Sequence, residues 1–278
     1  MKMKLKAVVA AVTMAAAVQA NAAINSDEPL HPFTGTGDGE MFLSVVDRGG
    51  TAPQSYVLDL GVTANGFRAD PAAFSFSQAA DGNLSSLLSH AASDGGSLFW
   101  NLAAMSNKGT LTDYGFLTTS GTPVTLTNTP IGSAGISSAT TNLGLYLNAV
   151  NFLPGMPAGN AANGSVLVTD TSNSAFYDNH TTGSWGSNWD NTGRGTEAAI
   201  GDSMGFYFVG LNPADNGLTS SLASFSGVWT LATDGTLTYG PAGGPAPVPL
   251  PPALWLLGSA LVGMVGVARR RNASTVAA

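Results

Sequence analysis

The chain of 278 residues contains no cysteine. This absence excludes disulfide bonds, cysteine nucleophiles and thiolate metal ligands. Lysine and arginine are scarce too, with 10 of them against 17 aspartates and glutamates, which gives a net charge of −7 at pH 7. A surface of that sign repels phosphate backbones, so nucleic-acid binding is not expected. Stability must come from an ordinary hydrophobic core.

The first 22 residues have the pattern of a secretory signal peptide. Three lysines begin it, an apolar stretch runs from Leu5 to Val18, and the small-residue pattern Ala20-Asn21-Ala22 follows. This arrangement predicts export and cleavage by signal peptidase after Ala22. An N-terminal membrane helix is the alternative, but the apolar stretch is short of the ~20 residues that span a bilayer.

Between the signal peptide and the C-terminal tail, only four cationic side chains remain: Arg48, Arg68, Lys108 and Arg194. All 17 acidic side chains lie in this exported part, so its net charge is −13. The charges are spread thinly, which is typical of a solvated surface rather than of a recognition patch. Its length of about 225 residues is enough for one sizeable domain or two small ones.

The exported part, residues 23–240, is predicted to be mainly β. Glycine, serine, threonine and asparagine are abundant, and the charged residues that favour exposed helices are scarce. Short alternating runs stand between turn residues and predict strands at 40–47, 55–62, 74–77, 97–105, 114–119, 122–128, 164–170, 204–211, 226–233 and 235–240. Asp234-Gly235 predicts a hairpin. Together these features favour an antiparallel β-sandwich-like domain.

One short helix is expected in this part. Leu143, Leu147 and Val150 fall at spacings of four and three, which predicts a helix from about Thr140 to Phe152. Pro154 and Gly155 follow it and are expected to end it.

The C-terminal region predicts a membrane span. Residues 250–268 carry no charge and, as a helix, reach about 28 Å, close to the ~30 Å of a hydrocarbon core. Arg269, Arg270 and Arg271 follow directly and favour a cytoplasmic tail over 269–278. A Pro/Gly-rich linker over 241–252 precedes the span. A permanent single-pass anchor with a stop-transfer end is the plain interpretation.

The same region resembles a known sorting signal. "VPLPPALWLLGSALVGMVGVARRR", residues 248–271, joins a proline motif, an apolar helix and an arginine cluster at the extreme C-terminus. It is similar to the PEP-CTERM signal of Gram-negative bacteria, in its VPLPA-type variant. The residues of the sorting motif are Val248, Pro249, Leu250, Pro251 and Pro252.

The resemblance implies export, transient anchoring in the inner membrane, cleavage near the prolines by an exosortase, and release to the cell surface or an exopolysaccharide matrix. Two departures leave the enzyme and the cleaved bond open. No glutamate stands between the prolines, and Pro252 stands where the variant usually has alanine. The body also resembles uncharacterised bodies ahead of such tails, through "GTGDGEMFLSVVD" and "SGVWTLATDGTLTY". That second resemblance implies no activity.

"GDSMG", residues 201–205, fits the G-x-S-x-G nucleophile pattern. In hydrolases that use this elbow, the serine stands between a strand and a helix, and the catalytic histidine follows it in the chain. Here His31, His90 and His180 all precede Ser203, and "FYFVG" after it is typical of a strand. We therefore expect a structural turn, and no catalytic residue is predicted.

Two further motifs are weak. "GTGDG", residues 35–39, has the wrong spacing for a dinucleotide loop and is expected to be a turn. "DNTGRGTE", residues 190–197, fails as an EF-hand, since Arg194 stands where an oxygen ligand is needed. A different calcium loop that uses Asp178, Asp190 or Glu197 stays open. No cofactor and no histidine metal site are predicted.

Residues 176–195 combine aromatic rings with polar side chains. Tyr177, Trp185 and Trp189 stand among asparagine, aspartate, threonine and glycine. Aromatic faces can stack on sugars, so these three residues are candidates for glycan binding. The alternative is that the rings hold a long loop against the core, because aromatic side chains bury a large area wherever they occur.

Three classes of function therefore remain. The favoured one is a surface or matrix protein with a structural or adhesive role in a biofilm or floc, with exopolysaccharide as a candidate partner. The alternatives are a carbohydrate-binding module and an extracellular hydrolase with an unrecognised acid pair, since spacing alone pairs none of the 17 acids.

Overall fold

The computed structural model describes residue 24 and residues 38–107, 110–121, 133–154, 156, 164–181 and 195–241. The chain divides into two units, Met1–Ala242 and Gly243–Ala278, and every described residue belongs to the first. Its strands are β1 Glu40–Arg48, β2 Ser55–Thr63, β3 Phe76–Gln78, β4 Ser97–Asn107, β5 Tyr114–Ser120, β6 Ser165–Val168, β7 Ala198–Ala199, β8 Ser203–Leu211, β9 Ser220–Leu231 and β10 Leu237–Pro241. Its helices are α1 Ala64–Ala69, α2 Gly82–Asp94, α3 Ser133–Asn151 and α4 Asp178–Thr181, with a 3₁₀ turn at Pro213–Asp215.

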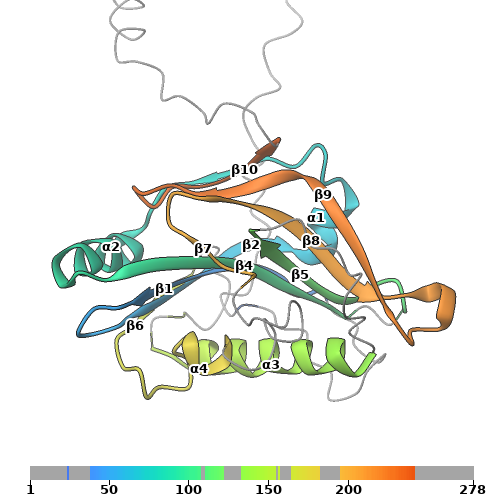
Figure 1. Ribbon diagram of the computed structural model, residues 1–278, viewed down its shortest axis with the longest axis horizontal. Helices are drawn as coiled ribbons and strands as arrows, with labels where there is room; N and C mark the ends of the chain where they lie inside the picture. The colour runs from blue at the N-terminus through green and yellow to red at the C-terminus, as the bar shows by residue number, and fades with distance from the viewer. Residues whose placement is uncertain are drawn as a thin grey trace, which may run out of the picture. The chain divides into compact units, whose positions relative to one another are not determined.

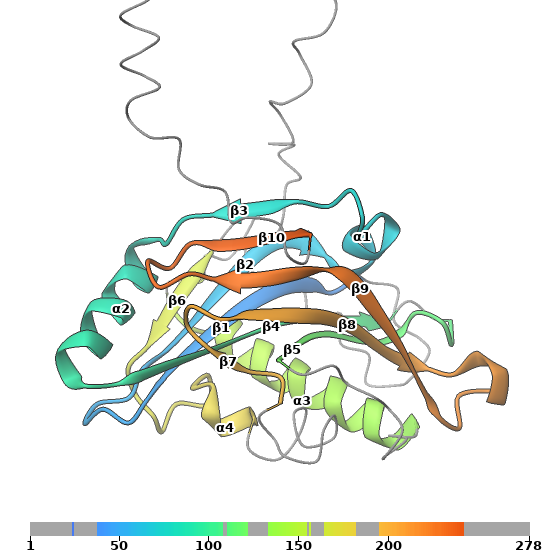
Figure 2. The same cartoon turned by 45° about the horizontal axis from the view of Figure 1, so that its top comes forward.

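The strands form one antiparallel sheet. Their order is β3-β10-β9-β8-β5-β4-β1-β2-β6, and the short β7 pairs with β4. The sheet curls, so that β8, β9 and β10 lie over the strands β1, β2 and β4 (Figures 1 and 2). The mainly β, antiparallel prediction is therefore confirmed. The described strands belong to one curled sheet, a half-barrel, and not to the two separate sheets of a sandwich.

Alternation along the central strands builds two cores, one on each face of the sheet. On β1, Phe42 and Val46 point to one face, while Leu43 and Val45 point to the other, and all four are at most 1% exposed. The second core lies inside the curl, because it joins residues of β1, β2 and β4 to residues of β8, β9 and β10. Successive side chains of a strand point to opposite faces, so a central strand buried on both sides is apolar at nearly every position.

Helix α3 covers the first core, which contains Phe42 and Val46 and is called the outer core below (Figure 1). The predicted helix is present, and it begins earlier than expected, at Ser133, and ends at Asn151. Leu143, Leu147 and Val150 are fully buried, as their spacing indicates. Ile136 and Ala139 extend the same buried stripe by two turns towards the N-terminus, which explains the additional length.

Helix α2 was not predicted, although its end signals are present. The side chain of Asp81 accepts a hydrogen bond from the backbone N–H of Leu84 (2.8 Å) and caps the N-terminus. Gly95 ends the helix in the left-handed conformation, at φ 72°. Leu84, Leu87 and Ala91 are its buried residues, and the two leucines belong to the core inside the curl.

The hairpin at Asp234-Gly235 joins β9 to β10 as predicted. Gly235 has φ 82°, and the carboxylate of Asp234 accepts the backbone N–H of Thr236 (2.9 Å). Each predicted strand within the described residues is present with ends shifted by a few residues. The candidate at 122–128 lies outside the described residues.

Candidate functional site

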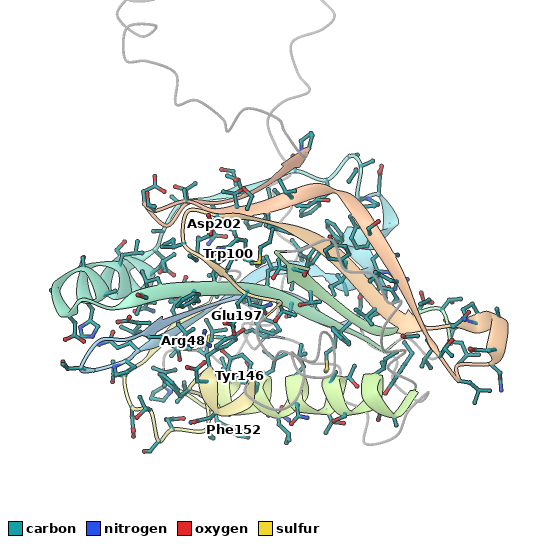
Figure 3. The ribbon with its side chains drawn as sticks, in the orientation of Figure 1. Arg48, Trp100, Tyr146, Phe152, Glu197 and Asp202 are labelled. Carbon is teal, nitrogen blue, oxygen red and sulfur yellow. The ribbon has the colours of Figure 1, made fainter. Side chains whose placement is uncertain are left out.

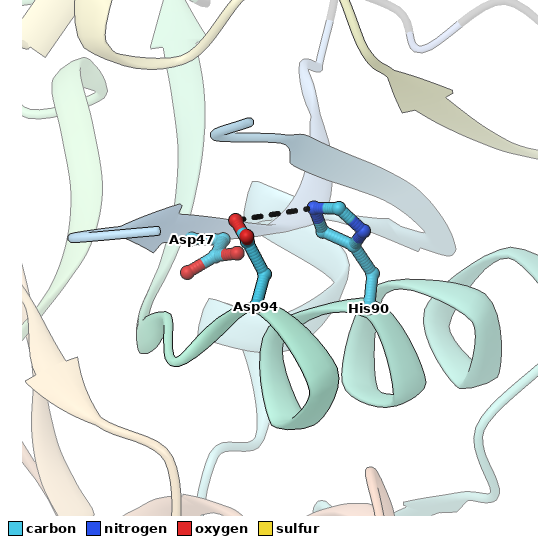
Figure 4. Close-up of side chains that lie close together, drawn as sticks. All are labelled: Asp47, His90 and Asp94. Atoms are coloured by element: carbon cyan, nitrogen blue, oxygen red, sulfur yellow. Dashed lines mark ion pairs between the residues drawn. The ribbon is translucent and has the colours of Figure 1, made fainter. Parts of the chain in front are cut away.

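Three chemically reactive side chains meet at the end of β1 and the C-terminal turn of α2. Asp47 comes from β1, and His90 and Asp94 stand one turn apart on α2 (Figure 4). One ligand atom of each lies within 4.8 Å of the others. The register of the β1–β4 pair explains the meeting, because it places Asp47 opposite Leu98, directly after the turn that ends α2.

Asp47 is the unusual member of this cluster. Its side chain is fully buried, and neither carboxylate oxygen has a hydrogen-bond partner of normal geometry. Burial raises the pKa of Asp47, and the carboxylate of Asp94 raises it further. His90 and the nearby backbone N–H of Ser97 oppose this rise in pKa. A buried carboxylate with no partner is costly, because it has lost its hydration without compensation.

Asp94 is held in place by the β1–β2 turn. The hydroxyl of Thr51 donates to one carboxylate oxygen of Asp94 (2.6 Å), and the backbone N–H of Ala52 donates to the other (3.0 Å). These bonds lower the pKa of Asp94, with the Thr51 hydroxyl as the largest cause. The Nε2 atom of His90 lies 2.8 Å from the carbonyl oxygen of Ala52 and 3.9 Å from Oδ2 of Asp94.

Two glycines leave room for the carboxylates. A Cβ atom on Gly96 would overlap the carboxylate of Asp47, and a Cβ atom on Gly50 would overlap that of Asp94. The turns that carry them also need glycine for conformation, since the preceding Gly49 and Gly95 have φ values of 98° and 72°. One imidazole nitrogen and two carboxylate groups, placed in this way, form a donor set that suits a divalent metal ion.

A second charged cluster lies around Arg48. The guanidinium donates from Nε to Asp178 (2.8 Å), and its Nη2 also pairs with Asp178. Its Nη1 donates to Glu197 (2.6 Å), and Figure 3 labels both Arg48 and Glu197. The side chains of Arg48 and Glu197 are only 15% and 3% exposed. Burial alone would lower the pKa of Arg48, but the bonds to Asp178 and Glu197 outweigh it and raise the pKa above its ordinary value. The cluster is a structural pairing of one guanidinium with two carboxyl groups.

This pairing bears directly on the calcium loop that the sequence left open. Asp178 and Glu197 are indeed brought together, from α4 and from the segment before β7. The cation between them is the guanidinium of Arg48, so these two carboxylates already have a partner. Asp190, the third candidate, lies outside the described residues.

The structure describes only one of the three glycan-binding candidates, Tyr177. Tyr177 is 1% exposed and packs edge-to-face on Tyr146 of α3, with ring centroids 5.9 Å apart. The ring is part of the outer core under α3 and offers no face to a sugar. The assignment of Tyr177 as a glycan-binding residue is therefore wrong. Trp185 and Trp189 lie outside the described residues, and for them glycan binding stays a prediction.

The "GDSMG" motif forms a strand start and not a nucleophile elbow. Gly201 has φ 98°, and Ser203 begins β8 two residues later. The hydroxyl of Ser203 lies 2.6 Å from that of Thr230, its neighbour on β9. The expected structural turn is therefore confirmed. In "GTGDG", Asp38 accepts the backbone N–H of Asn65 (2.7 Å) in the first turn of α1, whose N-cap is Thr63.

The sorting motif Val248–Pro252 and the cluster Arg269–Arg271 lie outside the described residues, as do the signal peptide and the predicted span at 250–268. Among the residues that are described, no helix is both long enough and apolar enough to cross a bilayer. Comparison with family models, with curated proteins and with solved structures found no match.

The sequence did not reveal the Asp47, His90 and Asp94 cluster. Its detectable part is the pair of His90 and Asp94 at a spacing of four, within a helix bounded by Asp81 and Gly95. Residues four apart share one helix face, so recognition of α2 would have placed these two side chains together. Asp47 could not have been added, because its position depends on the pairing of β1 with β4.

Proposed function

We propose that this protein is exported and sorted through its C-terminal signal to the surface or exopolysaccharide matrix of a Gram-negative cell, where its β-rich body has a structural or adhesive role. The observation that carries the proposal is the order of the last 31 residues: the proline motif at 248–252, the uncharged span to 268, and three arginines. With a signal peptide at the other end, this order fits transfer, arrest in the membrane and later cleavage.

The described part of the body supports a structural role through the way its reactive groups are used. Arg48 holds two carboxylates, and Arg68 pairs with Asp113 while its guanidinium lies over the ring of Phe208 at 3.7 Å. These are contacts between elements far apart in the sequence, and they hold the curled sheet and its covering segments together. A matrix component needs such a body to persist outside the cell without disulfide bonds.

The tail would act in two stages. The span at 250–268 holds the exported protein in the inner membrane, with Arg269–Arg271 on the cytoplasmic side. The extended Pro/Gly-rich linker at 241–252 then presents the sorting motif to an exosortase at the outer surface of that membrane. Cleavage there frees the body from its anchor.

Intact-mass measurement of the membrane-bound and surface-released protein in the native host tests this. The released form should begin at Ala23 and lack Arg271, while the membrane form keeps the tail. Replacement of Pro249, Pro251 and Pro252 by alanine should leave the protein in the membrane fraction. Release of protein with Arg271 still attached would leave only the plain-anchor interpretation.

The structural role needs a separate measurement. Deletion of the gene should reduce cell aggregation and retention of the polysaccharide matrix, and the parent chain should restore both. A chain that ends at Gly240 should be exported without anchoring and restore less. Unchanged aggregation and matrix in the deletion strain would refute the structural role while leaving the sorting pathway intact.

A further inference from the structure

We propose that Asp47, His90 and Asp94 bind one divalent first-row transition metal ion, with Zn²⁺ as the preferred ion. Two independent observations carry the proposal: the ligand atoms of the three side chains lie within 4.8 Å of one another, and Asp47 is fully buried with both oxygens unpartnered inside that cluster. The inference does not depend on the sorting signal.

The donor set favours zinc over calcium or magnesium. Imidazole nitrogen suits zinc and its neighbours, whereas calcium and magnesium take oxygen ligands almost exclusively. Zinc commonly binds through three protein side chains and leaves a fourth position for another ligand.

A metal ion would also supply what Asp47 lacks. Besides burial, the groups that shift the pKa of this carboxylate are His90, Asp94 and the Ser97 backbone, so no arginine or lysine among the described residues compensates it. Two neighbouring carboxylates repel unless one of them keeps a proton or a cation stands between them. The competing explanation is that a protonated His90 is itself that cation.

The cluster is open compared with a loaded zinc site. Zinc bonds of about 2.0–2.1 Å in a tetrahedron place ligand atoms roughly 3.3 Å apart, and Nε2 of His90 now lies 3.9 Å from Oδ2 of Asp94. Binding therefore requires the three side chains to move slightly closer together, and the contact between Nε2 of His90 and the carbonyl oxygen of Ala52 to break. The paired glycines at 49–50 and 95–96 stand in the two turns that would move.

Titration calorimetry with the untagged full-length chain, freed of metal by a chelator, tests the proposal. We expect one Zn²⁺ per chain, binding at least tenfold tighter than Ca²⁺ or Mg²⁺, and a rise in melting temperature that follows the same saturation curve. His90→Gln and Asp47→Asn should each weaken Zn²⁺ binding at least tenfold, since each removes one of only three protein ligands.

The chain offers matched controls. His31→Gln and His180→Gln each remove another histidine, and Asp202→Asn removes an exposed carboxylate; all three variants should bind Zn²⁺ like the parent. Circular dichroism in chelator shows that each variant is folded before titration. His90 is partly exposed, so His90→Gln decides the question even where Asp47→Asn does not fold.

Three results would overturn the proposal. The first is folded parent protein with no saturable Zn²⁺ binding; a lower metal-free melting temperature of His90→Gln would then give the His90 side chain a structural role in this cluster. Zn²⁺ binding that His90→Gln leaves unchanged would place the ion elsewhere on the chain. Tighter binding of Ca²⁺ than of Zn²⁺ would refute the part assigned to the imidazole.

Discussion

Asp59 on β2 should make the protein less stable as the pH rises towards neutrality. Its side chain is fully buried, one oxygen accepts the backbone N–H of Gly61 (2.8 Å), and the other oxygen has no hydrogen-bond partner. Burial raises the pKa of Asp59 from 3.8 to about 7, and the neighbouring Glu40 adds to the rise, against the effect of the Gly61 N–H.

The sign follows from proton binding. Between pH 3.8 and about 7 the folded protein keeps a proton on Asp59 that the unfolded chain has lost, so the free energy of unfolding falls as the pH rises through this interval. Each pH unit contributes about 1.4 kcal/mol, which gives roughly 4 kcal/mol over the whole interval. This is an upper bound, because relaxation around a buried charge lowers its cost. Outside the interval, Asp59 contributes no slope.

Urea unfolding of the parent and of Asp59→Asn between pH 4.5 and pH 8, in chelator, measures this effect. Asparagine keeps an oxygen for the Gly61 N–H and cannot ionise. The stability of Asp59→Asn relative to the parent should therefore rise by a few kcal/mol between the two pH values. Asp202→Asn, a change of an exposed carboxylate, serves as the control and should show no such drift.

Other carboxylates do not obscure the comparison. Hydrogen bonds lower the pKa values of three other aspartates. The main donor is the side chain of Ser172 for Asp170, the side chain of Thr219 for Asp215, and the backbone N–H of Thr236 for Asp234. Stability from these groups is present above the ordinary aspartate pKa and is lost as the pH falls below it. They act equally in parent and variant. A constant difference between Asp59→Asn and the parent from pH 4.5 to pH 8 would show that the Asp59 carboxylate is compensated, and the reasoning would fail.

Three other predictions concern the core, the charged cluster and the strand start. Phe67→Ala should cost about 3–5 kcal/mol in urea unfolding, because this buried ring makes edge-to-face contacts with four others, whereas Phe152→Ala, at an 89% exposed ring, should change stability by less than about 0.5 kcal/mol. Arg48→Leu should cost about 3–5 kcal/mol, because it leaves Glu197 buried without its cation, and Arg48→Lys should recover only part of that loss. Ser203→Ala should leave any ester or peptide hydrolysis unchanged, and a clear loss in a hydrolysis assay would reopen "GDSMG" as a catalytic motif.

Local patterns were sufficient to predict most of the strands. Alternation and turn residues mark β1, β2 and β8, since burial on the two faces of a sheet imposes a period of two. The hairpin at Asp234-Gly235 needed only the left-handed conformation that glycine permits. Helix α3 was found from three buried leucine and valine positions because an amphipathic helix repeats its apolar face every three to four residues.

The arrangement of those strands was not predictable in the same way. An alternating strand shows which side chains are buried, but not which strand pairs with it. The pairing of β5 with β8 joins Thr118 to Tyr207, far along the chain, and this pairing turns two expected sheets into one. Register is decided by long-range packing, so a sandwich and a curled single sheet have the same local pattern.

The cluster at the end of α2 was missed for the same physical reason. His90 and Asp94 lie on α2, and this helix was not predicted because its many serines lower helix propensity. The cap residues Asp81 and Gly95 were the remaining signals of its two ends. The remaining member of the cluster, Asp47, belongs to a strand that reads as an ordinary buried β-strand. Only the register of Arg48 with Ser97 brings the two together.

The scarcity of cations links the buried carboxylates of this protein. Residues 23–268 contain four lysines and arginines and 17 acids, and among the described residues Arg48 holds Asp178 and Glu197. Asp47 and Asp59 are both fully buried, and the described groups that shift their pKa values include no lysine or arginine.

A buried carboxylate without a cationic side chain beside it can avoid the free-energy cost of a buried charge in two other ways. It can keep a proton, or it can bind a metal ion. Asp59 stands beside a single second carboxylate and no imidazole, which favours the proton, whereas Asp47 stands beside His90 and Asp94, which favours the metal. Because a chelator removes the metal ion but not the proton, it should alter the stability of the parent but not the pH dependence that Asp59→Asn removes.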